Sequence, residues 1–505
     1  MVSTSLLRFL ALLVLSSLAS GRSTPRKSDD WTEKDQKILI LGGGVAGVIA
    51  ARTLHDHGHD NFVIIEARGE LGGRMMSRTF GTAENKYTIE LGANWVQGTQ
   101  VGNGPKNPIL ALAEKHKVKT IFVRIMSTVP TYDHTGFIDY LDVFNSAVDN
   151  YTSLTVAAGP RVIKRQVDTT SRTGYSLIGS KPKNRYAQVS EYYQFDWEYA
   201  QTPEQTSWIA SSWAENFTFV PDAGGFSEDN LFAIDQRGFK ALIQDEAKEF
   251  LKPDQLVLNQ TIKDIAYSAS GVKVTTTDGT EMSADYALCT FSVGVLQNDD
   301  VVFNPPLPDW KQEAIQSMTM ATYTKIFLQF PRNFWFHTQF ALYADSERGR
   351  YPVWQGLDIE GFFPESGILF VTVTGDYSER IEALPDSQVQ SEVMGVLRSM
   401  FPNVTVPDPE AFYFPRWFTN PLYRGSYSNW PASFYSDHHE NLRATVDQRL
   451  WFAGEATSMK WFGFLHGAYY EGVDVAKAMV KCIQAGGCVG LAHVNEVTNG
   501  RPYKI

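Results

Sequence analysis

The stretch that decides the fold is residues 37–66, which read KILILGGGVAGVIAARTLHDHGHDNFVIIE. An apolar run over 37–41 predicts a buried strand, and a second apolar run over 62–65 predicts another. Between them lie a glycine-rich turn and apolar residues with helical spacing. A strand, a helix and a second strand in this order are typical of a parallel sheet in an α/β domain. The sequence therefore predicts a protein of the α/β class.

The glycines of this turn have the spacing of a dinucleotide-binding loop. Gly42 allows a tight turn out of the strand, Gly44 lets the backbone approach a pyrophosphate, and Gly47 lets the helix pack against the strand. The helix directs its free N–H groups and its positive end toward the phosphates. Glu66 ends the second strand, where an acid accepts hydrogen bonds from a ribose. Such glycines also occur in ordinary turns, but this context favours a Rossmann-like nucleotide site.

The residues after the second strand indicate which dinucleotide binds. Ala67 and Arg68 come next, and Leu-Gly-Gly-Arg follows at 71–74. This run resembles the extended FAD fingerprint of flavin amine oxidases, which nicotinamide enzymes do not usually carry. In that resemblance Arg74 lies near the pyrophosphate, and Gly73 lets the chain pass close to it. The alternative is a surface turn with a solvated arginine.

The composition suits a folded protein of two or more domains. The chain has 505 residues, of which 43% are hydrophobic and 20% are charged, and its net charge is −11. A field of this sign repels nucleic acid and favours cationic ligands. Cys289, Cys482 and Cys488 form neither a disulfide scaffold nor a metal-ligand cluster, so no metal is expected. Cys482 and Cys488 flank a flexible loop that a bridge can close in an oxidising compartment, and Cys289 is predicted to be a buried thiol.

The N-terminus has the features of a secretory signal. Arg8 precedes an apolar run over 9–15 that is too short to span a bilayer, and small residues allow cleavage after Ala19. No later segment has the pattern of a membrane span. We therefore expect a signal peptide over 1–19, secretion to the extracellular space and no membrane partner. Four glycosylation sequons fit this expectation, and they begin at Asn150, Asn216, Asn259 and Asn403.

Away from the nucleotide motif, the periodicity changes along the chain. Residues 159–186 are polar and are predicted to be irregular. A three-strand meander is predicted over 261–290. Alternating patterns predict strands over 322–330 and 367–374, and the last helix is predicted to begin near Gly472.

The chain resembles the flavin-dependent polyamine oxidases of the monoamine oxidase superfamily, and most closely the secreted plant-type enzymes. The resemblance covers most of residues 36–490. It rests on several ordered matches, which together are far more specific than any one of them. The matching segments lie at 90–96, 195–200, 235–239, 323–327, 415–417, 428–431, 452–455 and 463–469.

The resemblance implies two interleaved domains, a Rossmann-like FAD-binding domain and an α+β substrate-binding domain. It also implies that polyamines are oxidised by hydride transfer to flavin N5, which yields an aminoaldehyde and a shorter amine while O2 is reduced to H2O2. A monomer is expected. The expected FAD-binding domain comprises 36–115, 226–309 and 418–485, the substrate-binding domain comprises 116–225 and 310–417, and a C-terminal tail follows over 486–505.

Lys325 is the implied catalytic residue. It matches the family lysine that holds a water against flavin N5, and it stands in an otherwise apolar strand over 323–330. If its side chain points inward, burial lowers its pKa. The alternative is a lysine that points outward from an edge strand.

The resemblance also implies the substrate-binding residues. Tyr427 and Phe464 match two aromatics that flank the amine in front of the flavin, where ring faces can desolvate an alkylamine. Glu198 matches an acidic tunnel residue that binds a distal ammonium, and Tyr199 and Tyr323 line the same tunnel. The alternatives are an ordinary core for the aromatics and a solvated loop for Glu198.

Gln97 departs from the pattern of the relatives. Plant-type enzymes have a glutamate after Trp-Val, and animal-type enzymes have a histidine nearby. With Gln97 the tunnel loses one negative charge. The order of preference among spermidine, spermine and their acetylated forms is therefore left open.

The resemblance implies a noncovalent FAD. Monoamine oxidases bind FAD through a cysteine just before the tyrosine that matches Tyr427, and Ser426 stands there in this chain. Trp417 is implied near the flavin ring, Glu455 near the pyrophosphate or ribityl chain, and Ile262 near the adenine. Val473, predicted at a helix N-terminus, is implied to offer its N–H to the reduced flavin. The other implied cofactor residues are Val45, Ala46, Gly92, Ala93, Asn94, Trp95, Gly454, Gly463 and Phe464.

Two other functions stay open at this point. An L-amino-acid or monoamine oxidase of the same superfamily shares most of these motifs, but an amino-acid oxidase needs an arginine for the substrate carboxylate, and no motif here supplies one. A nonenzymatic binding protein with the same fold has no reason to keep Lys325 with the aromatic pair. The colour of the purified protein separates this last class from the enzymes.

Overall fold

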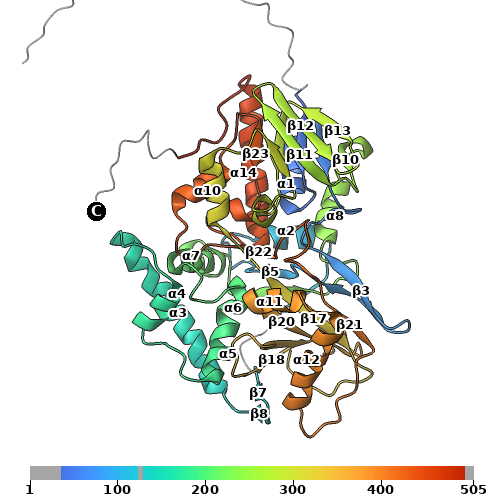
Figure 1. Ribbon diagram of the computed structural model, residues 1–505, viewed down its shortest axis with the longest axis vertical. Helices are drawn as coiled ribbons and strands as arrows, with labels where there is room; N and C mark the ends of the chain where they lie inside the picture. Colours follow the sequence, from blue (N-terminus) through green and yellow to red (C-terminus); the bar gives the residue numbers. More distant parts are fainter. Residues whose placement is uncertain (1–35, 123–128, 495–505) are drawn as a thin grey trace, which may run out of the picture.

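The computed structural model describes residues 36–122 and 129–494 of the chain. Figure 1 shows an elongated molecule, with a parallel sheet in one half and a large mixed sheet in the other. The predicted signal peptide at 1–19 lies outside the described residues, as do residues 495–505 of the predicted tail.

The parallel sheet confirms the predicted strand–helix–strand unit. β1 (Ile38–Leu41) pairs in parallel with β2 (Phe62–Ile65), and α1 (Val45–Asp56) connects them. Alternate side chains of β1 point to opposite faces of the sheet. One pair packs in a core with α1, and the other pair packs in a second core with the meander. All four side chains are completely buried. The strand order is β10 (Leu256–Val257), β2, β1, β14 (Tyr286–Cys289) and β23 (Leu450–Phe452).

The predicted meander over 261–290 is confirmed as three antiparallel strands. It covers one face of the parallel sheet, while the last strand of this region, β14, joins the parallel sheet itself. Gly279, at φ +89°, lies in the turn between the second and third strands. The meander and a fourth strand have the order β13 (Glu281–Ala284), β12 (Gly271–Thr276), β11 (Ile262–Ser268) and β15 (Val302–Asn304).

The other half of the molecule is built on a seven-stranded sheet. The two alternating regions of the sequence form β17 (Tyr323–Gln329) and β20 (Ile368–Thr374), which pair antiparallel and place Lys325 opposite Thr372. The sheet order is β21 (Ala411–Tyr413), β17, β20, β19 (Val353–Gly356), β18 (Phe340–Tyr343), β7 (Thr131–Asp133) and β8 (Gly136–Ile138). Two helices pack nearby, α11 (Gly375–Glu382) and α12 (Asp386–Met400).

A group of helices occupies the left side of Figure 1, and it corrects the prediction that residues 159–186 are irregular. The Thr170 side chain accepts a hydrogen bond from the Thr173 N–H and so begins a helix within this polar segment. The Tyr175 side chain of this helix is buried in the core that the helix shares with its neighbours. The group consists of α3 (Leu141–Ile163), α4 (Ser171–Leu177), α5 (Arg185–Gln194), α6 (Asp196–Tyr199) and α7 (Trp208–Phe219).

Small sheets lie between the two halves. β5 (Trp95–Gln97) and β6 (Thr120–Phe122) both pair with β9 (Asn230–Ala233), and β16 (Thr319–Ala321) pairs with β22 (Tyr427–Asn429). The remaining pair is β3 (Ser77–Gly81) with β4 (Lys86–Glu90), and the remaining helices are α2 (Pro108–Lys115), α8 (Ala241–Lys248), α9 (Val293–Leu296), α10 (Asp309–Ser317) and α13 (Ser436–Arg443).

The last helix, α14 (Leu465–Gln484), begins at Leu465 and not near Gly472 as predicted. Gly472 lies inside the helix, where a Cβ would come within 2.6 Å of the Ala46 carbonyl oxygen of α1. The glycine therefore serves close helix packing and does not mark a helix start.

The structure confirms the predicted states of the cysteines. Cys482 and Cys488 are joined by a disulfide, and Cys289 is a free, buried thiol. None of the helices formed by residues 36–122 and 129–494 combines the length and apolar character that crossing a bilayer requires.

Candidate active site

A cavity of about 510 Å³ lies between the parallel sheet and the seven-stranded sheet. Its size is within the range of small-molecule sites. Of the sequence-predicted site residues, only Gly47 and Val473 do not line it. The structure therefore brings together Gly42, Gly44, Val45, Ala46, Glu66, Ala67, Arg68, Gly73, Arg74, Gly92, Ala93, Asn94, Trp95, Gln97, Glu198, Tyr199, Ile262, Tyr323, Lys325, Trp417, Tyr427, Gly454, Glu455, Gly463 and Phe464.

The glycine turn has the geometry that a nucleotide phosphate requires. Gly42 has φ +111°, a conformation that side chains disfavour. Gly44 is the N-cap of α1, so the first free N–H groups of the helix begin beside the cavity. A Cβ on Gly47 would lie 2.1 Å from the Gly42 carbonyl oxygen. Gly47 thus fulfils the helix-packing role predicted for it without reaching the cavity.

The Glu66 carboxylate is held in place at the end of β2. The Gly43 N–H donates to its Oε2 at 2.7 Å, and the Arg68 N–H donates to its Oε1 at 2.9 Å. Each carboxylate oxygen keeps a second lone pair for a hydroxyl donor. This arrangement fits a ribose at the cavity wall.

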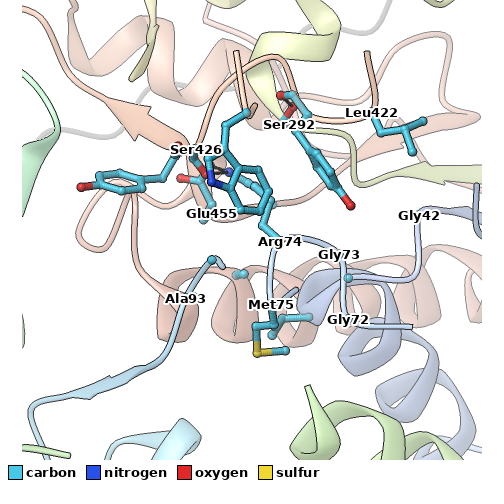
Figure 2. Close-up of a pocket in the computed structure, with 18 of the residues that line it drawn as sticks. Gly42, Gly72, Gly73, Arg74, Met75, Ala93, Ser292, Leu422, Ser426 and Glu455 are labelled. Carbon is cyan, nitrogen blue, oxygen red and sulfur yellow. Dashed lines mark hydrogen bonds and ion pairs between the residues drawn. The ribbon is translucent and has the colours of Figure 1, made fainter. Parts of the chain in front are cut away.

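Arg74 and Glu455 join the two sides of the cavity. Figure 2 shows Arg74 extending from the turn with Gly72 and Gly73 toward Glu455 and Ser426. Its Nη1 donates to Glu455 Oε1 at 2.8 Å and to the Ser426 carbonyl at 3.0 Å. The Gly463 N–H donates to Glu455 at 2.8 Å. Together with the open glycine turn and Glu66, a fixed arginine at this position fits the pyrophosphate and ribose of FAD.

No cysteine lines the cavity at the position of Ser426. The Ser426 hydroxyl accepts a hydrogen bond from the Tyr323 N–H at 2.8 Å and donates to the Tyr323 carbonyl at 3.1 Å. It therefore links β17 to the chain just before Tyr427. Among the described residues, the three cysteines are accounted for by the disulfide and the buried Cys289.

The role predicted for Val473 is wrong. Val473 lies in the interior of α14, where an N–H is donated to the carbonyl of the fourth residue before it. The helix start at the cavity instead belongs to Leu465, which lines the cavity next to Phe464. Sequence reasoning did not single out Trp197 within the matching segment 195–200, and it missed several lining residues that no motif marks, namely Asn230, Ser292, Leu422 and Tyr423.

Lys325 points inward, so the alternative of an outward-facing edge lysine is wrong. Its strand lies between β20 and β21, and the residue is 3% exposed. Its Nζ donates to the Gly92 carbonyl at 2.7 Å, to Asn94 Oδ1 at 2.9 Å and to the Glu90 carbonyl at 3.2 Å. Burial lowers the pKa of Lys325 to about 7, and the Glu90 carboxylate opposes this shift. Neutral and charged forms therefore both exist near pH 7.

Glu198 lies half-buried on α6 in the cavity wall. Burial raises the pKa of its carboxyl group to about 7. The Gln97 side chain donates to Glu198 Oε1 at 3.1 Å, so the residue that replaces the family acid orients Glu198. The Tyr427 hydroxyl donates to the Glu198 carbonyl at 2.8 Å. One carboxylate, one amide and an aromatic ring thus meet at this end of the cavity.

Tyr427 and Phe464 lie on neighbouring segments of the wall. Gly463 has φ +80°, and a Cβ there would lie 3.2 Å from the Tyr427 ring. The glycine therefore lets Tyr427 pack against the turn that presents Phe464. The Tyr323 and Tyr427 ring centroids are 6.1 Å apart, which extends the aromatic wall toward β17.

A second half-buried acid, Glu215, lies behind Tyr199. The Tyr199 hydroxyl donates to the Ser211 carbonyl at 2.8 Å and lies 2.8 Å from the Tyr151 hydroxyl, which donates to Glu215 Oε2 at 3.1 Å. Burial raises the pKa of Glu215 to about 8, with a further contribution from the Glu198 charge. Sequence reasoning missed Glu215, since its position in α7 carries no motif.

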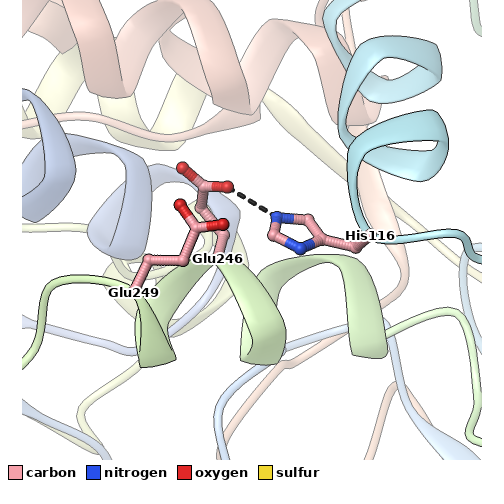
Figure 3. A group of neighbouring side chains, drawn as sticks. All are labelled: His116, Glu246 and Glu249. Carbon is pink, nitrogen blue, oxygen red and sulfur yellow. Dashed lines mark hydrogen bonds and ion pairs between the residues drawn. The ribbon is translucent and has the colours of Figure 1, made fainter.

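One group of side chains outside the cavity has the composition of a metal site. Figure 3 shows His116, Glu246 and Glu249, whose ligand atoms lie within 4.8 Å of one another. Lys115 and Arg52 each bond to both carboxylates, at 2.6–3.0 Å. These cations already neutralise the acids, so we interpret the group as an ion-pair cluster that joins α1, α2 and α8.

The fold and the cavity define a nucleotide-binding oxidoreductase, and comparison with known proteins gives its family. The sequence pattern of the flavin-containing amine oxidoreductases matches residues 45–480. The chain belongs to this family. It is an FAD-dependent amine oxidoreductase, which confirms the predicted fold, cofactor and enzyme class.

Several relatives are similar over the whole chain. Polyamine oxidase 1 from Zea mays is 35% identical, over 96% of this chain and 97% of the relative. Polyamine oxidase 7 from Oryza sativa subsp. japonica is 34% identical, over 93% and 99%. The structure of a putrescine oxidase bound to putrescine shares the fold, with a TM-score of 0.69, 16% identity, and coverage of 88% of this chain and 99% of that one.

Proposed function

We propose that this protein is a secreted oxidase of linear polyamines such as spermidine, spermine or their acetylated forms. The reaction takes a polyamine, O2 and water to an aminoaldehyde, a shorter amine and H2O2. The observation that carries the proposal is the 35% identity to a plant polyamine oxidase over nearly the full length of both chains.

The charged groups of the cavity support an amine over an amino acid. Arg68 and Arg74 are the only arginines among the described residues that line it. Arg68 donates to the Gly73 carbonyl at 2.7 Å, and Arg74 is bonded to Glu455. Both lie at the nucleotide end, where neither can clamp a substrate carboxylate. Glu198, at the other end, suits an ammonium group.

FAD, when bound, would supply the redox chemistry, namely oxidation of the carbon beside the amine and reduction of O2. Tyr427 and Phe464 hold the reacting amine between ring faces and exclude water from it. Desolvation in this wall favours the neutral amine, which is the form that can be oxidised. Lys325, near its own pKa, holds or releases a proton at Nζ beside Gly92 and Asn94.

Glu198 binds an ammonium group that is remote from the reacting carbon. A charge pair at 4 Å is worth about 4 kcal/mol at an effective dielectric constant of 20. Loss of water from both partners lowers that gain. A surviving gain of about 1.4 kcal/mol still separates a polyamine from a monoamine of equal length tenfold.

We further propose that FAD is bound noncovalently, because Ser426 offers no thiol. The secreted chain carries N-linked glycans and acts as a monomer. Of the four sequons, those at Asn259 and Asn403 suit a glycan best, since both asparagines are exposed outside helices and strands, whereas Asn150 and Asn216 lie within α3 and α7.

The test is peroxide formation with spermidine, spermine, their acetylated forms, benzylamine and a set of L-amino acids. We expect polyamines to react fastest and Glu198→Gln to raise their KM about tenfold. Glu471→Gln is the matched control, because burial also raises the pKa of Glu471 to about 7 while the residue lies outside the cavity lining. Faster oxidation of benzylamine or of an amino acid than of every polyamine would contradict the proposal.

A further inference from the structure

The C-terminal end of α3 carries a cluster of exposed apolar side chains. In residues 156–167, here termed the α3 tip, the exposed fractions are 71% for Val156, 42% for Val162, 83% for Ile163 and 79% for Val167. Single exposed aliphatics are normal on a protein surface. Val156, Ile163 and Val167 are the most exposed of the four and fall within twelve positions, and gatherings of exposed apolar side chains mark interaction sites.

The fold leaves this patch uncovered by any described residue. The side of α3 that faces the protein carries Tyr151, Leu154 and Ala158, all of which are buried. Val156 and Ile163 are two helical turns apart and lie together on the opposite side. Figure 1 shows α3 along the left edge of the molecule, so its outer side faces away from both sheets.

The α3 tip is basic within an acidic protein. It contains Arg161, Lys164 and Arg165, and no Asp or Glu occurs over 150–167, while the whole chain has a net charge of −11. Arg172, which follows the tip, is bound by Glu191 and Glu204. By contrast, none of the ion pairs within residues 36–122 and 129–494 includes Lys164 or Arg165, and both side chains are exposed. Their charge is therefore available to an external anion.

We propose that the α3 tip binds an anionic lipid surface as a peripheral contact. Aliphatic side chains next to lysine and arginine suit the boundary of a bilayer, where the chains enter the apolar layer and the cations meet lipid phosphates. This contact revises the sequence-based expectation of no membrane partner, and it requires no spanning helix. It is independent of the polyamine proposal, because it involves none of the residues of the cavity.

A lipid surface fits the tip better than a second copy of the chain. A helix end at the edge of the molecule suits shallow insertion, whereas a stable protein dimer needs about 800 Å² from each partner. The acidic remainder of the chain is repelled by anionic lipid, which leaves the tip as the side that approaches.

The experiment is sedimentation of the FAD-loaded, full-length protein with vesicles. One set contains phosphatidylcholine alone, and the other contains phosphatidylserine as a third of its lipid. We expect at least tenfold stronger binding to the anionic vesicles, and this difference should fall as salt is added. Equal binding to both sets, or binding to neither, would overturn the proposal.

Two double variants separate the contribution of the aliphatic side chains to lipid binding from that of the cationic side chains. Ile163→Ser with Val167→Ser, and separately Lys164→Glu with Arg165→Glu, should each lower anionic-vesicle binding at least fivefold. The matched control is Val302→Ser with Lys263→Glu, which changes an exposed aliphatic and an exposed base on neighbouring strands of the meander sheet. An equal loss in the control would overturn the assignment to the tip. So would a concentration-dependent dimer that is abolished by Ile163→Ser, since the occupant would then be a second copy.

Discussion

Lys325→Met should slow the chemistry of the site at least tenfold while preserving the fold. Methionine keeps the length and the apolar stem of lysine and removes only the ammonium. The substitution costs three hydrogen bonds, to Glu90, Gly92 and Asn94, at about 1 kcal/mol each. It also removes a buried cation whose pKa is lowered from 10.5 to about 7, a shift equivalent to about 5 kcal/mol between its two charge states.

Near neutral pH, the loss of these hydrogen bonds lowers the stability of the variant, whereas removal of the buried cation raises it. The folded protein releases the Lys325 proton near pH 7, whereas the unfolded chain releases it near 10.5. Stability in the wild type therefore rises with pH across that window, and the variant should lack this rise. At pH 7 the net change in the free energy of unfolding should stay within about 2 kcal/mol. Normal FAD content is the expected sign that the fold survives.

Turnover should fall at least tenfold, which corresponds to about 1.4 kcal/mol in the barrier. The assay is stopped-flow absorbance of the flavin, first during anaerobic reduction by spermidine and then during reoxidation by O2. Lys311→Met is the matched control, because Lys311 is equally buried and its Nζ also donates to three carbonyls, at 2.7–2.9 Å, but outside the cavity. It should lower stability and leave both rates unchanged. Wild-type rates in both half-reactions of Lys325→Met would refute the role of Lys325.

Three further predictions follow from the site and the cysteines. Acid precipitation should release the yellow cofactor into the supernatant, and flavin retained by the denatured protein would contradict noncovalent binding. The KM for spermidine should fall as pH rises through about 7, because Glu198, whose pKa is raised to about 7, gains its charge there; a KM that is flat in the wild type, or that still falls in Glu198→Gln, would exclude this residue. Mass mapping without reduction should show one crosslinked peptide with Cys482 and Cys488, and their reduction should cost roughly 2 kcal/mol of stability for so short a loop.

Local sequence signals predicted the nucleotide half of the fold well. The boundaries of β2 agree with the predicted strand, and β1 differs by one residue, because these runs are continuous, apolar and bounded by glycine or acid. Lys325 was placed in a strand for the same reason. The start of α14 was missed because Gly472 looks like a helix boundary in sequence, whereas its function is to approach Ala46 in space.

Contacts between distant segments limited how much of the site could be predicted from the sequence. The hydrogen bond from Gln97 to Glu198 and the Tyr199–Tyr151–Glu215 chain join segments that share no local pattern. Tyr199 lines the cavity, as the resemblance implied, but the hydrogen bond from its hydroxyl to helix α7 could not be predicted from sequence. The polar segment at 159–186 was misjudged similarly, since burial of Tyr175 supplies the apolar contact that its composition does not suggest.

The contact between α1 and α14 has a consequence for the biosynthesis of the enzyme. Among the described residues, the helix that begins at the glycine turn is one of the first elements to leave the ribosome, and the helix that packs on it is the last element. Glu455 and Gly463, which complete the cavity wall, also emerge late. We therefore expect a nascent chain to retain FAD poorly until its final helix is in place. Cofactor loading belongs to the completed polypeptide, and a truncated chain without its final helix should leave the ribosome as a colourless protein.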